Sequence, residues 1–186
     1  MKTASSLLAI VLLALAVGST AAFAGDEVMV GGEAMFKTKD IVDNAVNSKD
    51  HTTLVAAVKA AGLVETLKSK GPFTVFAPTN DAFENLPAGT VETLLKPENK
   101  GTLTTVLTYH VVEGRMGFNT IAKEIRAGNG TATLKTMSGG KLWATMNGEH
   151  NIVVKDEKGN VANISTYDVY QSNGVIHVVD KVLLPK

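Results

Sequence analysis

The sequence predicts an α+β protein whose sheet is mainly antiparallel. Helical spacing of apolar residues dominates the first half of the chain, whereas from Tyr109 onward apolar residues recur with a period of two. Gly-Gly and Asn-Gly pairs, which are typical of hairpin turns, separate the short segments of the second half. Helices that come early and strands that come late favour segregated layers over alternating β-α-β units.

The first 24 residues differ from the rest of the chain. Lys2 gives a basic start, Leu7 to Val17 is an uninterrupted run of 11 apolar residues, and Ala22-Phe23-Ala24 has a small-x-small pattern. These features predict a secretory signal peptide over residues 1–24. The apolar run is too short for a membrane helix, which needs about 20 residues. We therefore expect a secreted or periplasmic protein with no membrane insertion after cleavage.

The remaining residues are expected to form an arm and one domain. Residues 25–39 contain Gly31-Gly32 and no sustained periodicity, so they are predicted to be an N-terminal arm outside the core. Residues 40–186 are long enough to bury a single core without disulfides.

Several helices are expected within that domain. Asp50 is predicted to cap one helix, and Gly62 to end it. Asp81 and Glu84 have the spacing of a capping box at the start of another, which carries Phe83. The predicted helices begin at Asp40 and after Pro78, and otherwise cover residues 50–61, 63–70, 90–95, 98–107 and 118–126.

Two of the expected strands are apolar on both faces. They are residues 73–77, which Pro78 ends, and Val175 to Val179. Strands of this kind belong in the middle of a covered sheet, so we predict that the two pair there. The other expected strands are residues 109–113, 131–137, 141–146, 150–155, 161–166 and 167–170.

Composition excludes several classes of function. The 18 basic and 18 acidic residues cancel, and there are only two arginines, so a nucleic-acid partner is not expected. The absence of cysteine removes disulfides, thiolate metal sites and cysteine nucleophiles. The four histidines lack metal-ligand spacing and no known catalytic motif occurs, so we expect no enzyme, no metal and no cofactor.

Three side chains with rings, those of His110, His177 and Trp143, are candidates for either a structural role in the core or a role in binding. His110 and His177 each share a predicted strand face with valines, which predicts buried, neutral, hydrogen-bonded rings that oppose folding on acidification. The alternative for both is a binding or pH-sensing role. Trp143 shares a face with Lys141 and Thr145. It is expected either to cap a cluster under a loop, which we favour, or to anchor a partner.

Three motifs in order resemble those of the fasciclin, or FAS1, domain family. Gly71 to Phe83 resembles the first signature box, Leu107 to Val112 the central tyrosine-histidine motif, and Ser172 to Pro185 the second box. The resemblance covers about residues 40–185. Met29-Val30-Gly31-Gly32, within the arm, and residues 47–66 further resemble small secreted single-domain bacterial members.

The resemblance implies a β-wedge of two mainly antiparallel sheets with several helices packed around it. It also implies a non-catalytic role in cell adhesion or extracellular protein contact. Most of the motif is expected to specify architecture. The residues in question are Phe73, Pro78, Asp81, Phe83 and His177.

The family also implies binding candidates. Receptor binding in animal relatives involves positions near the tyrosine-histidine motif and the second box, which correspond to Tyr109, His110 and Asp180. With Trp143 these are the candidate binding residues, and the expected partner is an extracellular or cell-surface protein or glycan. Neutral charge also permits weak self-association. The alternative function is a carrier of a small apolar ligand between sheet and helices, which requires a pocket of about 300 Å³.

Overall fold

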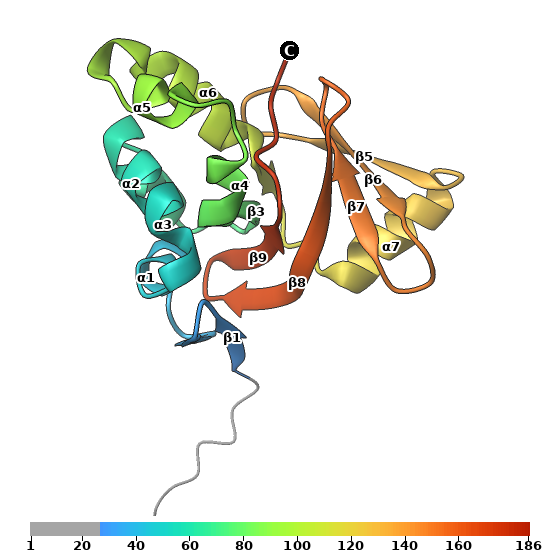
Figure 1. Ribbon diagram of the computed structural model, residues 1–186. Coiled ribbons are helices and arrows are strands. Elements are labelled where there is room, and N and C mark those ends of the chain that lie inside the picture. The colour runs from blue at the N-terminus through green and yellow to red at the C-terminus, as the bar shows by residue number, and fades with distance from the viewer. Residues whose placement is uncertain (1–26) are drawn as a thin grey trace, which may run out of the picture.

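The two strands that are apolar on both faces lie side by side in the sheet. β3 (Phe73–Pro78) pairs in parallel with β9 (Gly174–Val179), from Phe73 opposite Gly174 to Pro78 opposite Val179. Every residue of both strands is buried. The computed structural model, which describes residues 27–186, therefore confirms the predicted pairing (Figure 1).

The main sheet has seven strands in the order β4-β3-β9-β8-β7-β6-β5. Apart from the β3–β9 pair, all of its neighbouring strands are antiparallel, which confirms the α+β class. The remaining strands are β4 (Val111–Glu113), β5 (Thr131–Lys135), β6 (Lys141–Met146), β7 (Ile152–Lys155) and β8 (Val161–Gln171).

One long strand, β8, connects the two halves of this sheet. The sequence pattern predicts two strands here, whereas β8 is a single strand of 11 residues. Its register shifts between Ile164 and Thr166 and again between Thr166 and Val169. Irregularities of this kind bend and twist a strand. The first part of β8 therefore pairs with β7 and the second part with β9, which produces the expected wedge.

The two edge strands of the sheet also approach each other. Val112, in β4, forms an isolated bridge with Thr136, just after β5. The Met137 N–H donates to the Val111 carbonyl at 2.8 Å. These contacts close one end of the wedge.

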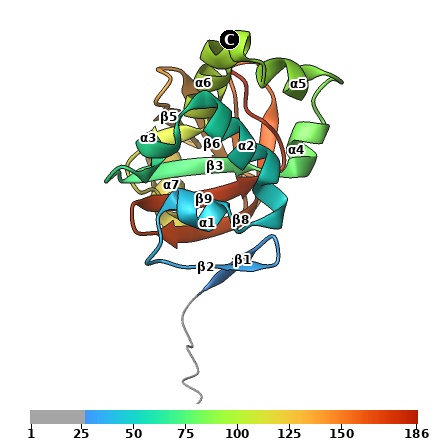
Figure 2. The same ribbon diagram turned by 90° about the vertical axis from the view of Figure 1, so that its left-hand side faces the viewer.

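Helices cover one side of the central strands. In Figure 2 α1, α2 and α3 lie in front of β3 and β9. The helices are α1 (Ile41–Ala45), α2 (Thr52–Ala61), α3 (Val64–Lys68), α4 (Asn80–Glu84), α5 (Thr90–Leu94), α6 (Lys100–Tyr109) and α7 (Phe118–Ala127), with 3-10 turns at Lys49–His51 and Pro97–Asn99.

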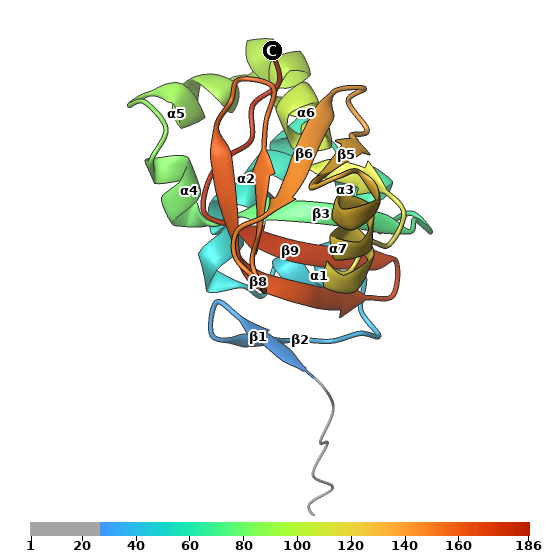
Figure 3. The same cartoon turned by 90° about the vertical axis from the view of Figure 1, so that its right-hand side faces the viewer.

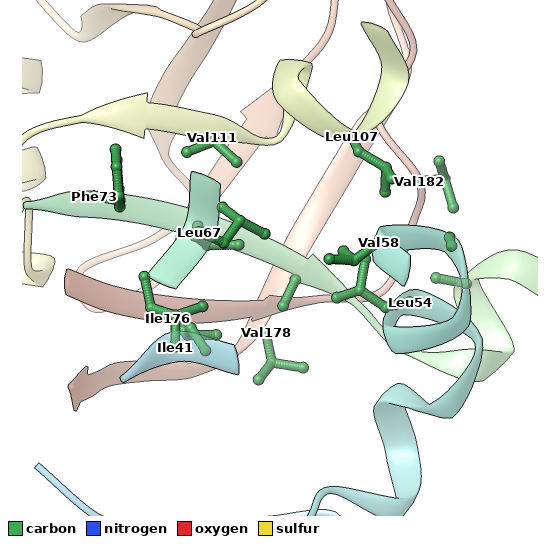
Figure 4. Packing of buried hydrophobic residues seen from close by; sticks show 14 of the residues in the cluster. Ile41, Leu54, Val58, Leu67, Phe73, Leu107, Val111, Ile176, Val178 and Val182 are labelled. Atoms are coloured by element: carbon green, nitrogen blue, oxygen red, sulfur yellow. The ribbon is translucent and has the colours of Figure 1, made fainter. Parts of the chain in front are cut away.

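Each side of the β3–β9 pair has its own core. The first core lies under the helices, where Leu54, Val58 and Leu67 gather with Val111 and Ile176 (Figure 4). The second lies inside the wedge and includes Phe76, Val179, Leu142, Val154 and, from α7, Ile125. Two cores explain why both faces of the central strands are apolar.

Two expected helix caps are wrong. Asp50 lies in a 3-10 turn, and α2 begins at Thr52 without a side-chain cap. Thr79, not Asp81, caps α4, because its hydroxyl accepts the Ala82 N–H at 3.3 Å. Asp81 lies instead in the first turn, where a carboxylate suits the positive end of the helix. Gly62 ends α2 as predicted, with a φ of 74°.

The boundary between α6 and β4 also differs from the prediction. Tyr109 is the last residue of α6 and His110 is its C-cap, so the strand begins only at Val111. The His110 N–H donates to the Leu107 carbonyl at 3.1 Å, as in a final helical turn. His110 therefore does not share a strand face with Val112.

The N-terminal arm contributes to the first core. Its residues form a hairpin of β1 (Val28–Val30) and β2 (Glu33–Met35). Val30 and Met35 are buried in the first core, so the expectation that the arm lies outside the core is wrong for these two residues. The predicted signal peptide lies outside the described residues. Within 27–186, no helix has the length and apolar character needed to cross a bilayer.

Candidate functional site

Tyr109 lies inside the wedge and is fully buried. Its hydroxyl donates to the Lys141 carbonyl at 2.7 Å and accepts the Glu157 N–H at 2.9 Å. Burial is the main cause that raises the pKa of this phenol to about 12. The hydroxyl joins the end of α6 to β6 and to the turn after β7. Any role of Tyr109 in partner binding would therefore be indirect.

We expect Tyr109→Phe to lower the free energy of unfolding by about 1–3 kcal/mol, because it leaves a part-buried N–H and a part-buried carbonyl without their partner. Urea unfolding followed by far-UV circular dichroism measures this change. A loss below about 0.5 kcal/mol, the level of an ordinary surface substitution, would contradict this role of the hydroxyl.

His110 is also an interior ring. Its Nδ1 lies 2.8 Å from the Val106 carbonyl, and the Leu183 N–H donates to Nε2 at 2.9 Å. Nε2 must be unprotonated to accept that bond, which assigns the neutral tautomer with a proton on Nδ1. Burial lowers the pKa of His110 to about 4. The ring joins α6 to the C-terminal segment and does not reach the surface.

His177 has a similar environment in β9. Its Nε2 lies 2.8 Å from the Met116 carbonyl, and its ring stacks on Phe76 with 5.7 Å between centroids. Burial lowers the pKa of this ring. Both histidines are thus hydrogen-bonded core residues, as predicted. Sequence reasoning missed a third buried ring, His51, whose Nδ1 lies 2.8 Å from the Ser48 hydroxyl.

The other motif positions also serve the fold. Phe73 and Phe83 are part of the first core. Pro78 is the last residue of β3, and Asp81 lies in the first turn of α4. The most characteristic residues of the motifs therefore lie mostly in the interior or at the ends of elements.

Asp180 lies at the surface, directly after β9. Its carboxylate accepts two hydrogen bonds from Asn163, one from the backbone N–H and one from the side-chain amide, both at 2.7 Å. Asn163 is an exposed residue of β8 that pairs with Val153 of β7. Asp180 therefore holds β8 against the end of β9 and lies at the margin of the outer face of the sheet.

Trp143 lies on the same outer face, in the middle of β6. It is partly exposed and belongs to neither core, so the favoured expectation that it caps a buried cluster is wrong. Its neighbours across the strands are Thr133 and Lys155, and the Lys155 ammonium lies 5.9 Å from the ring centre. The structure thus puts Trp143 on this outer face and Asp180 at its margin, while Tyr109 and His110 stay inside.

We call this surface the β5–β8 face, and define it by the outward residues of four antiparallel strands. Residues between them point inward and are buried. The face consists of Thr131, Thr133, Lys135, Lys141, Trp143, Thr145, Val153, Lys155, Val161, Asn163 and Ser165.

The β5–β8 face carries three lysines and no acidic residue. Lys135 lies directly opposite Lys141, and Lys155 lies opposite Trp143. Within residues 27–186, none of the three forms an ion pair. Like charges directly opposite each other destabilise a strand pair. The face is therefore positively charged and carries its aromatic ring among the lysines.

Two hollows occur elsewhere in the described chain. An apolar cavity of about 60 Å³ lies between the helices and β3, with His51 and His110 in its wall. It is far smaller than the pocket of about 300 Å³ that the ligand-carrier alternative requires. A groove of about 470 Å³ between β4 and β5 is lined by Glu113, Glu124 and Lys135 among others. In residues 27–186 no three acidic or histidine side chains gather where they could share a metal ion.

The sequence is similar to known proteins over most of its length. The family model described as Fasciclin domain matches residues 49–185. Protein sll1483 of Synechocystis is 50% identical over 147 residues, which are 78% of this chain and 73% of that protein. Immunogenic protein MPB70 of Mycobacterium bovis is 36% identical over 146 residues, 76% of this chain and 66% of the other.

An animal relative and a solved structure extend this similarity. Transforming growth factor-beta-induced protein ig-h3 of Sus scrofa is 36% identical over 145 residues, which are 78% of this chain but 19% of that protein. The FAS1 domain pair of the insect cell adhesion molecule fasciclin I superposes with a TM-score of 0.69 at 18% identity. That match covers 78% of this chain and 51% of the other.

Proposed function

The chain belongs to the fasciclin domain family, and on this premise we propose that it is an extracytoplasmic adhesion module that binds a protein or glycan at the cell surface. The module acts by surface contact and not by catalysis. The observation that carries the proposal is a division between interior and exterior. The ring side chains of the family motifs form hydrogen bonds within the protein interior, whereas the β5–β8 face is exposed to solvent.

The interior residues have no group to spare for a partner. Both nitrogens of His110 and the hydroxyl of Tyr109 are engaged with backbone groups. The β5–β8 face, in contrast, exposes Trp143 beside lysines without ion pairs. Partly exposed aromatic residues and unpaired charges are the groups from which binding surfaces draw affinity and specificity.

Export and family membership support the same function. The predicted signal peptide over residues 1–24 would place the domain outside the cytoplasm. The solved FAS1 pair comes from a cell adhesion molecule. The apolar cavity of about 60 Å³ gives no support to the alternative function of a ligand carrier.

Binding to the native cell surface tests the proposal. Purified protein of residues 25–186 is mixed with envelope fractions from cells of the native organism that lack the gene, and retention is measured after sedimentation. We expect saturable retention that unlabelled protein displaces. Absence of retention, together with unchanged adhesion of the deletion strain, would overturn the proposal.

A further inference from the structure

We propose that the β5–β8 face binds an anionic polysaccharide that carries carboxylate or sulfate groups. Trp143 stacks on a sugar ring, and Lys135, Lys141 and Lys155 contact the acidic groups. This inference rests on the proposed surface function and adds the chemical class of the partner. Figure 3 views the molecule from the side of the strands that carry this face.

The first argument is the placement of charge. Lys135 and Lys141 are direct cross-strand neighbours, an arrangement that costs stability unless a counter-charge is present. Lys155 lies one strand further, opposite Trp143. No Asp or Glu is among the residues that define the face. An anionic ligand lying across β5, β6 and β7 would supply the missing charge.

The second argument is the position of the aromatic ring. Trp143 stands at the middle of β6, with Lys155 5.9 Å from its ring centre, so that an apolar surface and a cation lie together. Exposed aromatic rings offer flat apolar area at little entropic cost. Thr133 lies directly opposite Trp143, and Thr145 lies two residues further along β6 on the same face, so two residues with hydroxyl groups neighbour the ring along the sheet. Sugar rings present the matching combination of apolar faces and hydroxyl edges.

Four acidic residues border this face but form no ion pair with its lysines within residues 27–186. The two oxygens of Glu157 accept backbone N–H groups, and those of Asp180 accept both bonds from Asn163. Glu113 and Glu124 line the groove between β4 and β5, which Lys135 also lines. None of these four carboxylates forms an ion pair within the described part of the chain.

The polar composition of the β5–β8 face favours a glycan over a protein or a nucleic acid as its partner. Only Trp143, Val153 and Val161 are apolar on the face, whereas the centre of a protein interface is depleted of charge. A nucleic acid is disfavoured because the chain has zero net charge and neither arginine lies on this face.

Direct binding measurements with defined polymers test the inference. The probes are polygalacturonate, which carries carboxylates, dextran sulfate, which carries sulfates, and unsubstituted dextran, with isothermal calorimetry as the readout. We expect one or both charged polymers to bind, dextran to bind at least tenfold more weakly, and affinity to fall as salt is added. Equal binding of dextran, or no binding of either charged polymer, would overturn the inference.

Variants of the face locate the binding site. We expect Trp143→Ala, and separately the replacement of Lys135, Lys141 and Lys155 by Gln, to weaken binding on the order of tenfold. The matched control replaces three exposed lysines on the helical side by Gln, which changes the net charge equally and leaves affinity within about twofold. The control positions are Lys70, Lys96 and Lys100.

Outcomes of the variants are decisive once circular dichroism shows that each one folds. An equal loss in the control would show that binding follows overall charge and not this face. Wild-type affinity in both face variants would show that the polymer binds elsewhere on the protein and would also overturn the inference. If the wild type binds native envelopes but neither charged polymer, this inference fails while the proposed function stands. If envelopes are not bound either, the proposed function fails as well.

Discussion

Replacing Asp156 by Ala is expected to lower the free energy of unfolding by about 3–5 kcal/mol, because it removes the acceptor for four hydrogen bonds in a buried site. Asp156 is 1% exposed. Its carboxylate accepts N–H groups of Lys158, Asn160 and Leu184 and the side-chain amide of Asn160, at distances of 2.8 to 2.9 Å. The residue joins the turn between β7 and β8 to the C-terminal segment.

Urea unfolding at neutral pH, monitored by tryptophan fluorescence, measures the effect of this substitution. Asp81→Ala is the matched control, because that carboxylate is exposed in the first turn of α4 and its loss should cost at most about 1 kcal/mol. A loss below about 1 kcal/mol for Asp156→Ala, or an equal loss for the control, would show that the turn does not depend on this carboxylate.

Acidification is expected to destabilise the fold by about 3 kcal/mol between pH 7 and pH 4 through His110 alone. Burial lowers the pKa of His110 to about 4, against 6.5 for an unperturbed ring. Below pH 6.5 the unfolded chain therefore binds a proton that the folded chain does not. The contribution of the neutral His110 ring to the free energy of unfolding is therefore fully present above pH 6.5 and is lost as the pH falls toward 4. His177 and His51, whose pKa values burial also lowers, act in the same direction.

The free energy of unfolding measured by urea at several pH values from 7 to 4 tests this dependence. His110→Gln should reduce the slope with pH even though it lowers stability at pH 7. The pKa of Asp43 is lowered by its hydrogen bond to Lys68, and this exposed pair acts only at the acidic end of the range. A stability that does not change from pH 7 to pH 5 would contradict the assignment of neutral buried rings.

Much of the fold could be predicted because its strongest sequence patterns reflect burial. The strands at 73–77 and 175–179 are apolar on both faces because each has a core on either side. The predicted secondary structure was wrong where one sequence pattern is compatible with both a helix and a strand. Tyr109 and His110 fit the end of a helix as well as the start of a strand, and only packing selects the helix. β8 was divided in two because its register shifts interrupt the period of two.

The candidate site was only partly predictable for a different reason. Alternation along β6 correctly placed Trp143 on the face of Lys141, away from the inward residues. That Lys135 and Lys155 flank the same ring depends on strand pairing, which periodicity does not reveal. Asp156 was missed because it lies in a Gly-containing turn, where Asp is common for local reasons. Its bond to Leu184 is a long-range contact.

The most direct test of the account compares an interior variant with an exterior one in the same envelope-binding measurement. Tyr109→Phe removes hydrogen bonds of a buried side chain, and Trp143→Ala removes the aromatic ring of the β5–β8 face. With binding expressed per folded molecule, we predict that Tyr109→Phe retains the affinity of the wild type and Trp143→Ala loses most of it. Loss of binding in folded Tyr109→Phe with full binding by Trp143→Ala would contradict the division between a structural interior and a binding exterior.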